Sequence, residues 1–297
     1  MIRLRDVTVA YGDKVILDNI NLDIHQGETL AVLGASGSGK STILRLIIGL
    51  QKPTKGHVFF QDTDITAYDE DQLMEVRRHM GMVFQYSALF DSMTVGENVA
   101  FGLRQHTHDD AATRQRIVKE KLHLVGLDGI EDMMPNNLSG GMKRRFGIAQ
   151  ALLNDPKILI IDEPTAGLDP EERLRFYNLL SELAVERIIL LSTHIASDIE
   201  ATCSKAAVLS SGTVVFEGQI EKLLQPGNGK VYTTTILQNE LNQFKQKYRV
   251  ISIHQNGINV SCRFLSNAAQ KKEWVSCQPT IEDSYMYLLS SFKQGVE

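Results

Sequence analysis

The pattern of hydrophobic and polar positions predicts buried strands that alternate with helices. Residues 2–10 and 15–24 alternate apolar with polar side chains, as half-buried strands do. Three later runs are almost continuously apolar, which is typical of strands buried on both faces: 29–33, 157–162 and 188–192. Helices are expected at 41–50, over most of 69–154 and at 171–184. This alternation predicts an α/β fold with a mostly parallel sheet, and the opening strands predict an antiparallel β subdomain.

A change of pattern divides the chain into predicted domains of residues 1–222 and 223–297, the second a small α+β accessory region. Its start is rich in proline and glycine and is expected to be a linker. Asn256-Gly257 favours a hairpin turn, because both residues tolerate positive φ. Thr280 and Asp283 have the spacing of a capping box for a final helix. We therefore predict a βαββ-containing module, with strands at 231–236, 250–254 and 258–264 and helices at 237–248 and up to Phe292.

Composition and charge narrow the class of protein. The chain has 297 residues, of which 43% are hydrophobic and 23% charged, values typical of a soluble folded protein. Its net charge of −5 gives no support to a nucleic-acid-coating role, which needs a basic face. No apolar run reaches the ~18 residues of a membrane span, the N-terminus lacks a signal-peptide pattern, and the 3 spaced cysteines favour reduced cytosolic thiols. Any connection with a membrane is therefore expected to come through a partner.

A glycine-rich segment between the strand 29–33 and the helix 41–50 predicts a phosphate-binding loop. It fits the pattern GxxxxGKS in the strand–loop–helix context that the pattern requires. Glycines allow successive N–H groups to point at phosphate oxygens, and the helix adds its positive end. Lys40 can bridge the β- and γ-phosphates of ATP, and the Ser41 hydroxyl can ligate Mg²⁺; the alternative is a glycine-rich turn without a ligand. The candidate nucleotide-binding residues here are Gly34, Ala35, Ser36, Gly37, Ser38, Gly39, Lys40, Ser41 and Thr42.

The apolar strand 158–161 ends in two acids, Asp162 and Glu163. An aspartate at the carboxyl end of a strand beside such a loop can hold Mg²⁺, directly or through water. Glu163 would then face the γ-phosphate and polarise an attacking water, or position that water without accepting its proton. Two solvated acids that cap a strand are the alternative.

The stretch Leu138–Met142, with sequence LSGGM, resembles the signature motif of ABC transporter ATP-binding subunits, which is LSGGQ in most members. The resemblance implies a P-loop NTPase fold, RecA-like, with a helical signature subdomain at about residues 86–155. It also implies that Ser139, Gly140 and Gly141 contact the γ-phosphate of ATP bound to the opposite subunit, so that two copies clamp two nucleotides head to tail. An ordinary serine helix cap would be favoured if the motif stood alone.

Further matches to this family occur in the family's order and cover residues 1 to about 222. Tyr11 resembles the aromatic residue that stacks on adenine, although it could be an ordinary hairpin tyrosine. Gln85 matches the glutamine thought to touch Mg²⁺ and water and to relay to the membrane partner. Asp169 lies in a match to the loop that crosses the dimer, and His194 matches the switch histidine, which would hydrogen-bond the γ-phosphate. The resemblance thus implies Glu163, His194, Gln85 and Lys40 as catalytic residues, and Ser41, Gln85 and Asp162 as metal ligands.

Two subfamily resemblances divide the chain. Residues 84–99 resemble the ATPase of Mla-type lipid-trafficking importers, whereas 146–153, 190–200 and 279–285 resemble ATPases of the type-2 ABC exporter group. Either the chain is a mosaic or engineered, or its lineage shares traits of both. The segment 85–95 is expected to form a groove for a partner's short helix, or else subdomain core, through Tyr86, Leu89, Phe90 and Met93.

The resemblance implies the ATP-binding and ATP-hydrolysing subunit of an ABC transporter, with ATP and Mg²⁺ as cofactors. It would act as a homodimer with a separate integral membrane permease, peripherally at the cytoplasmic face of the inner (plasma) membrane, in export or lipid trafficking and without nucleic acid. One alternative is a non-transport ABC ATPase that acts on nucleic acid or ribosomes. Three features argue against this alternative: the chain has a single cassette, no long heptad insertion and no basic arm. Another is a nucleotide-binding module that no longer hydrolyses ATP.

Overall fold

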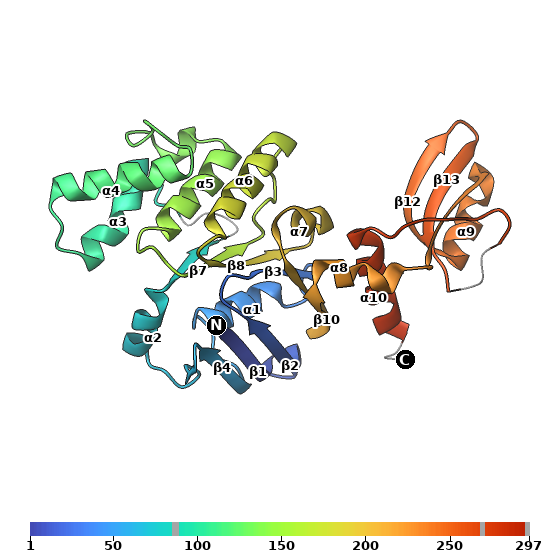
Figure 1. Ribbon diagram of the computed structural model, residues 1–297, viewed down its shortest axis with the longest axis horizontal. Helices are drawn as coiled ribbons and strands as arrows, with labels where there is room; N and C mark the ends of the chain where they lie inside the picture. Colours follow the sequence, from blue (N-terminus) through green and yellow to red (C-terminus); the bar gives the residue numbers. More distant parts are fainter. Residues whose placement is uncertain (85–88, 268–270, 295–297) are drawn as a thin grey trace. The chain divides into compact units, whose positions relative to one another are not determined.

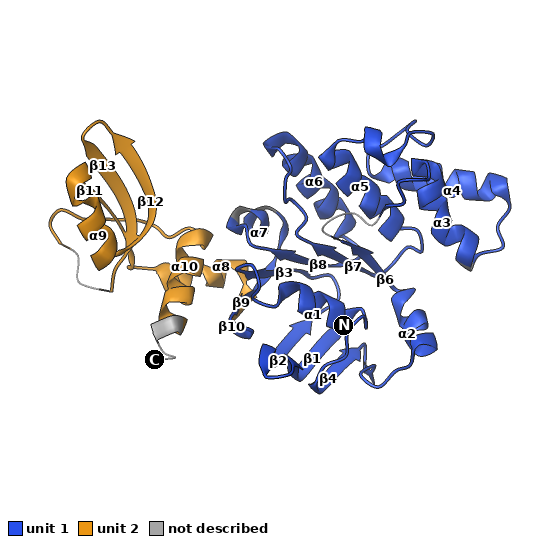
Figure 2. Ribbon diagram, turned by 180° about the vertical axis from the view of Figure 1, so that it is seen from behind, with its two compact units in different colours: residues 1–214 blue, residues 215–297 orange. Residues whose placement is uncertain are grey.

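The computed structural model describes residues 1–84, 89–267 and 271–294, and the chain separates into two compact units (Figure 2). The first unit comprises Met1–Val214 and the second Val215–Glu297. The domain boundary expected after residue 222 remains a prediction. Figure 1 gives the element labels, and each unit is described on its own.

A six-stranded sheet forms the centre of the first unit and ends in β10, which continues past the unit boundary at Val214; the prediction of a mostly parallel sheet is confirmed. Strands β3, β7 and β8 are buried along their whole length, as their continuous apolar runs predicted. The pairs β3–β8, β3–β9, β7–β8 and β6–β7 are all parallel. In sheet order the strands are β10 (Thr213–Gln219), β9 (Lys205–Ser210), β3 (Thr29–Gly34), β8 (Ile188–Thr193), β7 (Ile158–Asp162) and β6 (Met80–Val83).

A second, antiparallel sheet contains the opening strands and confirms the predicted β subdomain. Its order is β2 (Lys14–Ile24), β1 (Ile2–Tyr11), β4 (Lys55–Phe60) and β5 (Thr63–Asp64). The buried positions of β1 alternate with less buried ones, because one face of the strand turns towards the core. Leu4 and Leu22 from this sheet pack in one hydrophobic cluster with Leu30, Ile43 and Ile160.

The helices of the first unit lie on both sides of the parallel sheet. In Figures 1 and 2, α3–α6 lie on one side of β7 and β8, while α1 and the antiparallel sheet lie on the other. None of the described helices is long and apolar enough to cross a bilayer. The helices are α1 (Lys40–Ile47), α2 (Glu70–Arg77), α3 (Val95–His106), α4 (Ala111–Leu124), α5 (Gly140–Ala151), α6 (Pro170–Leu183) and α7 (Ala196–Thr202), with a 3₁₀ turn at Pro135–Asn137.

Strand β6 departs from the expectation that 69–154 is mostly helical. Only four residues long, it shows no period of its own. Its Gly81 lies against the end of α5, where a Cβ would come within 2.4 Å of the Ala151 carbonyl oxygen. The strand therefore depends on pairing with β7 and on close backbone packing, neither of which a local pattern reveals.

The second unit is an antiparallel sheet with short helices, as predicted. The hairpin at Asn256-Gly257 is confirmed, with Gly257 at φ 60°. The helix expected from residue 237 begins at Leu241 instead, because the Glu240 carboxylate accepts a hydrogen bond from the Leu237 N–H (3.1 Å) and closes a 3₁₀ turn. The sheet order is β12 (Arg249–Asn256), β13 (Asn259–Leu265), β11 (Val231–Leu237) and β14 (Val275–Ser276), and the helices are α8 (Ile220–Leu223), α9 (Leu241–Lys247) and α10 (Ile281–Gln294).

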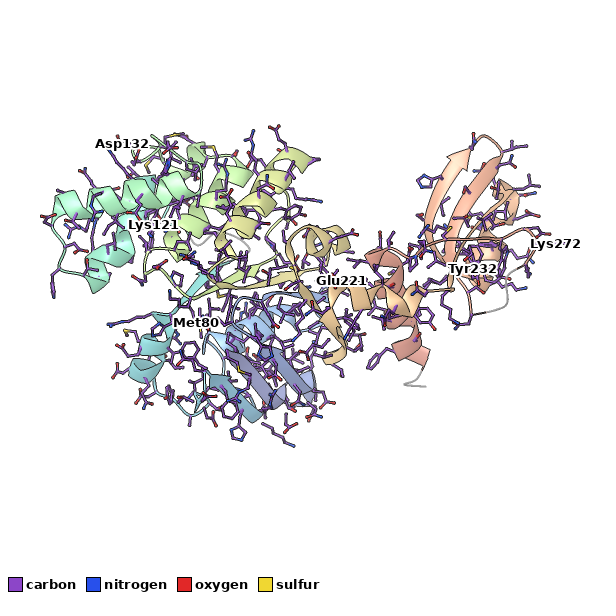
Figure 3. All side chains as sticks on the ribbon, in the orientation of Figure 1. Met80, Lys121, Asp132, Glu221, Tyr232 and Lys272 are labelled. Carbon is purple, nitrogen blue, oxygen red and sulfur yellow. The ribbon has the colours of Figure 1, made fainter. Side chains whose placement is uncertain are left out.

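Aromatic side chains form the core of this unit. Tyr232, labelled in Figure 3, lies 5.4 Å from Trp274 between ring centroids. Phe264 lies 4.9 Å from both Phe244 and Trp274 in edge-to-face contacts, a favourable arrangement for aromatic rings. Trp274 is the chain's 1 tryptophan and is 4% exposed. Its fluorescence therefore reports on the second unit alone.

The predicted capping box at the start of α10 is confirmed and continues into a buried ion pair. The Thr280 N–H donates to Asp283 Oδ2 (2.7 Å) and the Asp283 N–H to Thr280 Oγ1 (3.2 Å). The Arg263 guanidinium donates through Nε to both Asp283 oxygens (3.0 and 3.1 Å). Burial alone raises the pKa of Asp283, but the hydrogen bonds from Arg263 and Thr280 outweigh it and hold this pKa below its ordinary value.

The second unit is therefore expected to lose stability in acid. Because the folded pKa of Asp283 is lowered, its stabilisation is complete well above the unfolded pKa of about 3.9 and is lost as the pH falls through that value towards the folded pKa. Urea unfolding followed by Trp274 fluorescence from pH 6 to 3 measures this, and Asp283→Asn is the control. An acid slope that is the same in Asp283→Asn would contradict the assignment.

Candidate functional site

The loop between β3 and α1 needs glycine at two positions for different reasons. A Cβ on Gly34 would lie 2.5 Å from Ser38 Oγ and 2.7 Å from the Leu209 carbonyl oxygen. Gly39, at φ 107°, precedes the first turn of α1 and provides no side-chain cap for it. The first N–H groups of a helix have no intrahelical partner. Within the described residues the buried Ser38 Oγ has no hydrogen-bond partner either. The loop thus collects unpaired donors suited to phosphate oxygens.

Lys40 is turned inward at the start of α1, with only 6% of its side chain exposed. Its Nζ donates to the carbonyl oxygens of Gly34 (2.9 Å) and Ala35 (3.3 Å). The same nitrogen lies 3.1 Å from Glu163 Oε1. A buried ammonium with these acceptors is held at the mouth of the loop, where a phosphate group can approach it.

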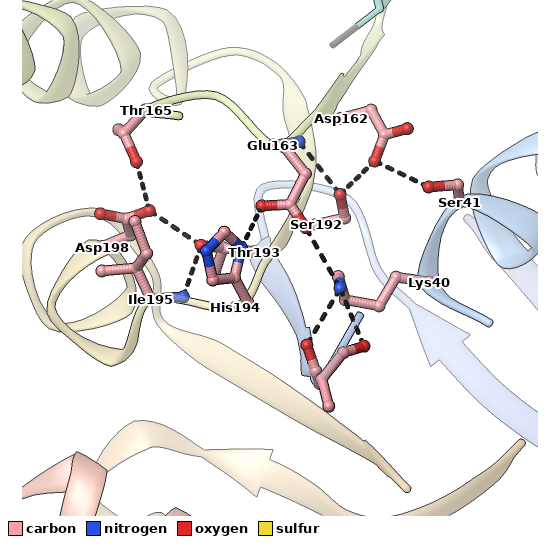
Figure 4. A network of polar contacts seen from close by, with 12 residues as sticks. Lys40, Ser41, Asp162, Glu163, Thr165, Ser192, Thr193, His194, Ile195 and Asp198 are labelled. Atoms are coloured by element: carbon pink, nitrogen blue, oxygen red, sulfur yellow. Dashed lines mark hydrogen bonds and ion pairs between the residues drawn. The ribbon is translucent and has the colours of Figure 1, made fainter. Parts of the chain in front are cut away.

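Glu163 follows the end of β7 and joins the lysine to the histidine. Its Oε2 lies 2.6 Å from His194 Nδ1, so the two carboxylate oxygens contact Lys40 and His194 separately (Figure 4). Its backbone has φ 49°, a strained conformation for a residue with a side chain. The Glu163 N–H donates to both the carbonyl oxygen and Oγ of Ser192 (3.1 Å each), which holds it there. Such strain is concentrated at functional sites.

Asp162 and Ser41 offer two oxygen atoms beside the Glu163 carboxylate that can act as metal ligands. Asp162 is 7% exposed, and its Oδ1 accepts from Ser41 Oγ (3.1 Å) and from the Ser192 hydroxyl. Mg²⁺ binds through one or two protein oxygens together with substrate phosphates and water. These two residues therefore fit a magnesium site.

Lys40, Ser41, Glu163 and His194 line one pocket of about 440 Å³, whereas the buried Asp162 lies next to this lining without being part of it. The pocket also includes Lys14 and Ile16, which the sequence did not mark as site residues. Both lie on β2, just after the turn that carries Tyr11, and that adjacency was the available signal. Among the predicted residues, the structure brings together Ser36, Gly37, Gly39, Lys40, Ser41, Thr42, Glu163 and His194 in the pocket lining.

Four predicted residues lie elsewhere in the first unit. Ser139 caps α5, where its Oγ accepts from the Met142 N–H (3.1 Å), and Asp169 caps α6, where it accepts from the Glu172 N–H (2.9 Å). Ser139, Gly140 and Asp169 are exposed and do not line the pocket. Gly141 packs so closely on α6 that a Cβ would lie 2.1 Å from Glu172 Oε2. The caps of α5 and α6 are thus linked, and both face outward.

Tyr11 lies next to the pocket lining, whereas the residues predicted for the partner groove lie away from that lining or outside the described residues. Tyr11 is 62% exposed at the β1–β2 turn, next to pocket residue Lys14 in the strand register. Gln85 and Tyr86 lie outside the described residues. Leu89 and Met93 are half-buried.

Phe90 lies partly in the core and partly at the surface. It is 44% exposed and contacts Phe101 at 4.8 Å between ring centroids. Its backbone is held by the buried Asn98, which accepts from the Phe90 N–H (2.8 Å) and donates to the Phe90 carbonyl oxygen (3.0 Å). The backbone of Phe90 is therefore held in place, with part of the ring at the surface.

Comparisons with known proteins identify the family. A family model described as "ABC transporter" matches residues 17–166. The intermembrane phospholipid transport system ATP-binding protein MlaF of Haemophilus influenzae is 40% identical over 228 residues, which covers 76% of this chain and 86% of that protein. The methionine import ATP-binding protein MetN of Desulfitobacterium hafniense is 35% identical over 278 residues, 91% of this chain and 81% of that protein, so one relative spans both halves of the chain.

The structural comparison agrees. The ATP-binding cassette MJ0796, solved as a dimer in a post-hydrolysis state with ADP and phosphate, matches with a TM-score of 0.69 and 33% identity over 74% of this chain and 99% of that one. The chain belongs to the ABC transporter family, as one of its ATP-binding proteins.

Proposed function

We propose that this chain hydrolyses ATP to ADP and phosphate, with Glu163 as the residue that activates water. One observation carries the proposal: Glu163 contacts Lys40 through one oxygen and His194 through the other, beside the Ser41–Asp162 pair. A carboxylate held between a cation and a histidine, beside oxygens that can hold Mg²⁺, is suited to polarise a water that attacks the γ-phosphate.

Each group has a separate task in this scheme. Lys40 leaves its loop carbonyls to bind the β- and γ-phosphates, and this frees Glu163 Oε1 to accept a hydrogen bond from water. His194, 53% exposed on its side chain, holds the other Glu163 oxygen and can turn to the γ-phosphate. Mg²⁺, held by Ser41 and Asp162, would neutralise charge on the phosphate oxygens.

We infer that each catalytic site is completed by a second copy of the chain, head to tail. Support comes from Ser139, which is exposed and away from the pocket of its own chain. Its Oγ accepts from the Met142 N–H, so its proton remains available to an acceptor from outside. At the start of α5 the N–H groups of Gly140 and Gly141 have no intrahelical partner, as an anion site requires.

Mixing two inactive variants tests the shared site. Lys40→Ala and Ser139→Arg should each abolish most phosphate release, since each damages both sites of its own dimer. Mixed dimers contain one site with an intact Lys40 and an intact Ser139 from different chains, so phosphate release should reappear on mixing. No recovery, with mixed dimers shown to form, would contradict the shared site. Wild-type release no faster than that of Lys40→Ala would contradict hydrolysis itself.

We further propose that the dimer drives an integral membrane permease at the cytoplasmic face of the inner membrane. The names of MlaF and MetN describe ATP-binding parts of transport systems. The exposed part of the Phe90 ring, on a backbone held by Asn98, suits contact with a permease helix. Pull-down from detergent-solubilised membranes should recover a protein with membrane spans, and Phe90→Asp should weaken its recovery. Recovery of nucleic acid or ribosomes instead would favour a non-transport ABC ATPase.

A further inference from the structure

A buried carboxylate outside the pocket joins the two loops that carry Glu163 and His194, the proposed catalytic pair. Asp198 on α7 is only 1% exposed. Its Oδ2 accepts from the hydroxyls of Thr165 (2.6 Å) and Thr193 (2.8 Å), and its Oδ1 accepts from the Tyr177 hydroxyl. Figure 4 shows the Thr165 and Thr193 bonds to Asp198 beside the Glu163–His194 contact. Burial and then Asp198 itself raise the pKa of Tyr177 far above its ordinary value, so the tyrosine stays a donor.

The residues that Asp198 binds lie close in sequence to the catalytic pair. Thr165 follows Glu163 by two residues, and Thr193 directly precedes His194. One carboxylate oxygen therefore ties together the chain leaving β7 and the chain leaving β8. These are the segments whose separation determines the distance between Glu163 and His194.

The direction of the hydrogen bonds requires a carboxylate at this position, because all three hydroxyls donate to Asp198. An ionised carboxylate only accepts, so each of its partners must donate its proton to Asp198. Thr193 Oγ1 then keeps its lone pairs for the Ile195 N–H, which donates to it at 3.0 Å. This bond fixes the backbone on both sides of His194.

A third contact extends the network to α6. Tyr177 lies on this helix, whose first turn is capped by Asp169. The segment from Thr165 to Asp169 is thus held at both ends. Thr165 binds Asp198 directly, and the helix that follows Asp169 is held through the hydrogen bond from Tyr177 to Asp198. The same carboxylate therefore restrains the catalytic pair and the segment proposed to face the second copy.

We propose that Asp198 is a positioning residue for ATP hydrolysis, which holds the Glu163 and His194 loops at the separation that the reaction needs. The proposal rests on the proposed function of Glu163 and His194. Asp198 does not touch the pocket and acts only through Thr165 and Thr193.

Replacement of Asp198 by asparagine tests this at nearly constant volume. An amide offers one acceptor oxygen instead of two and adds an N–H₂ donor, so it cannot accept from both threonines and from Tyr177 at once, and the network loses either the threonine link or its attachment to α6. We expect kcat for phosphate release to fall about tenfold or more, with KM for ATP changed less than about threefold, since the loop that binds the phosphates is untouched.

A double-mutant cycle separates positioning from general loss of structure. If Asp198 acts through the Glu163–His194 pair, Asp198→Asn should have little further effect on kcat in a His194→Ala background. Effects that multiply in the double variant would overturn the proposal, as would a wild-type kcat in Asp198→Asn. If Asp198→Asn does not fold, Thr193→Val removes the same link at similar volume and should give the same pattern.

A matched control and the wild-type protein distinguish the possible failures. Asp283 is also 1% exposed and hydrogen-bonded, but it lies in the second unit. Asp283→Asn should lower the stability of that unit and leave kcat unchanged; an equal fall of kcat in both aspartate variants would point to a purely structural role and overturn the proposal. Absence of hydrolysis in the wild-type protein would overturn the proposed function, whereas normal hydrolysis in Asp198→Asn overturns the positioning role alone.

Discussion

Replacement of Glu163 by glutamine is expected to lower kcat for ATP hydrolysis by about 100-fold or more, because general-base catalysis contributes roughly 10²–10⁴-fold. Glutamine keeps the shape of the side chain and can still contact His194, but it cannot carry the charge that polarises water. It also removes the ion pair that holds Lys40 at 3.1 Å, so nucleotide should bind at least as well. ATP-dependent dimers should therefore accumulate.

Phosphate release and size-exclusion chromatography with ATP measure the two effects together. The matched control is Glu182→Gln, which changes an exposed carboxylate on α6 and should behave like wild type. A Glu163→Gln protein that releases phosphate at the wild-type rate would remove Glu163 from the reaction. A slow variant that stays monomeric with ATP would leave the catalytic role intact but contradict the nucleotide-bridged dimer.

Replacement of Arg263 by alanine is expected to destabilise the second unit by about 3 kcal/mol, because it leaves a buried carboxylate without its cation. Asp283 is 1% exposed, and both of its carboxylate oxygens accept a hydrogen bond from Nε of Arg263. The Thr280 cap remains but is neutral. The same guanidinium also donates to the Gln278 carbonyl oxygen (2.8 Å), so the chain entering α10 loses a second restraint.

Trp274 fluorescence in urea measures this change in the second unit directly. Arg249→Ala is the matched control: this arginine is an exposed residue of β12, and surface substitutions of this kind usually change stability by less than about 0.5 kcal/mol. Equal unfolding midpoints for the Arg263 and Arg249 variants would show that the buried pair contributes nothing net. Desolvation, which offsets the attraction in buried ion pairs, would be the physical reason for that result.

Local patterns predicted most of the fold. The continuous apolar runs of β3, β7 and β8 and the alternation of β1 identified both sheets, since burial on two faces or on one leaves a direct mark on the sequence. The Asn256-Gly257 turn and the Thr280 cap were found because they depend on the conformational preferences of a few adjacent residues. Strand β6 was missed because its stability comes from neighbours distant in sequence.

The candidate site, like the fold, was predicted from the sequence only in part. The glycine-rich loop with Lys40, the acids at the end of β7 and the serine–glycine–glycine turn are contiguous motifs, so the sequence predicted these candidate site residues and, through them, the family. Only the tertiary structure showed that Glu163 contacts Lys40 and His194 at once, that Lys14 and Ile16 border the pocket, and that Asp198 gathers Thr165, Tyr177 and Thr193. The physical reason is that parallel strands bring their carboxyl ends together from distant parts of the chain. A motif can name a residue, whereas the partners of its side chain depend on which strands lie side by side.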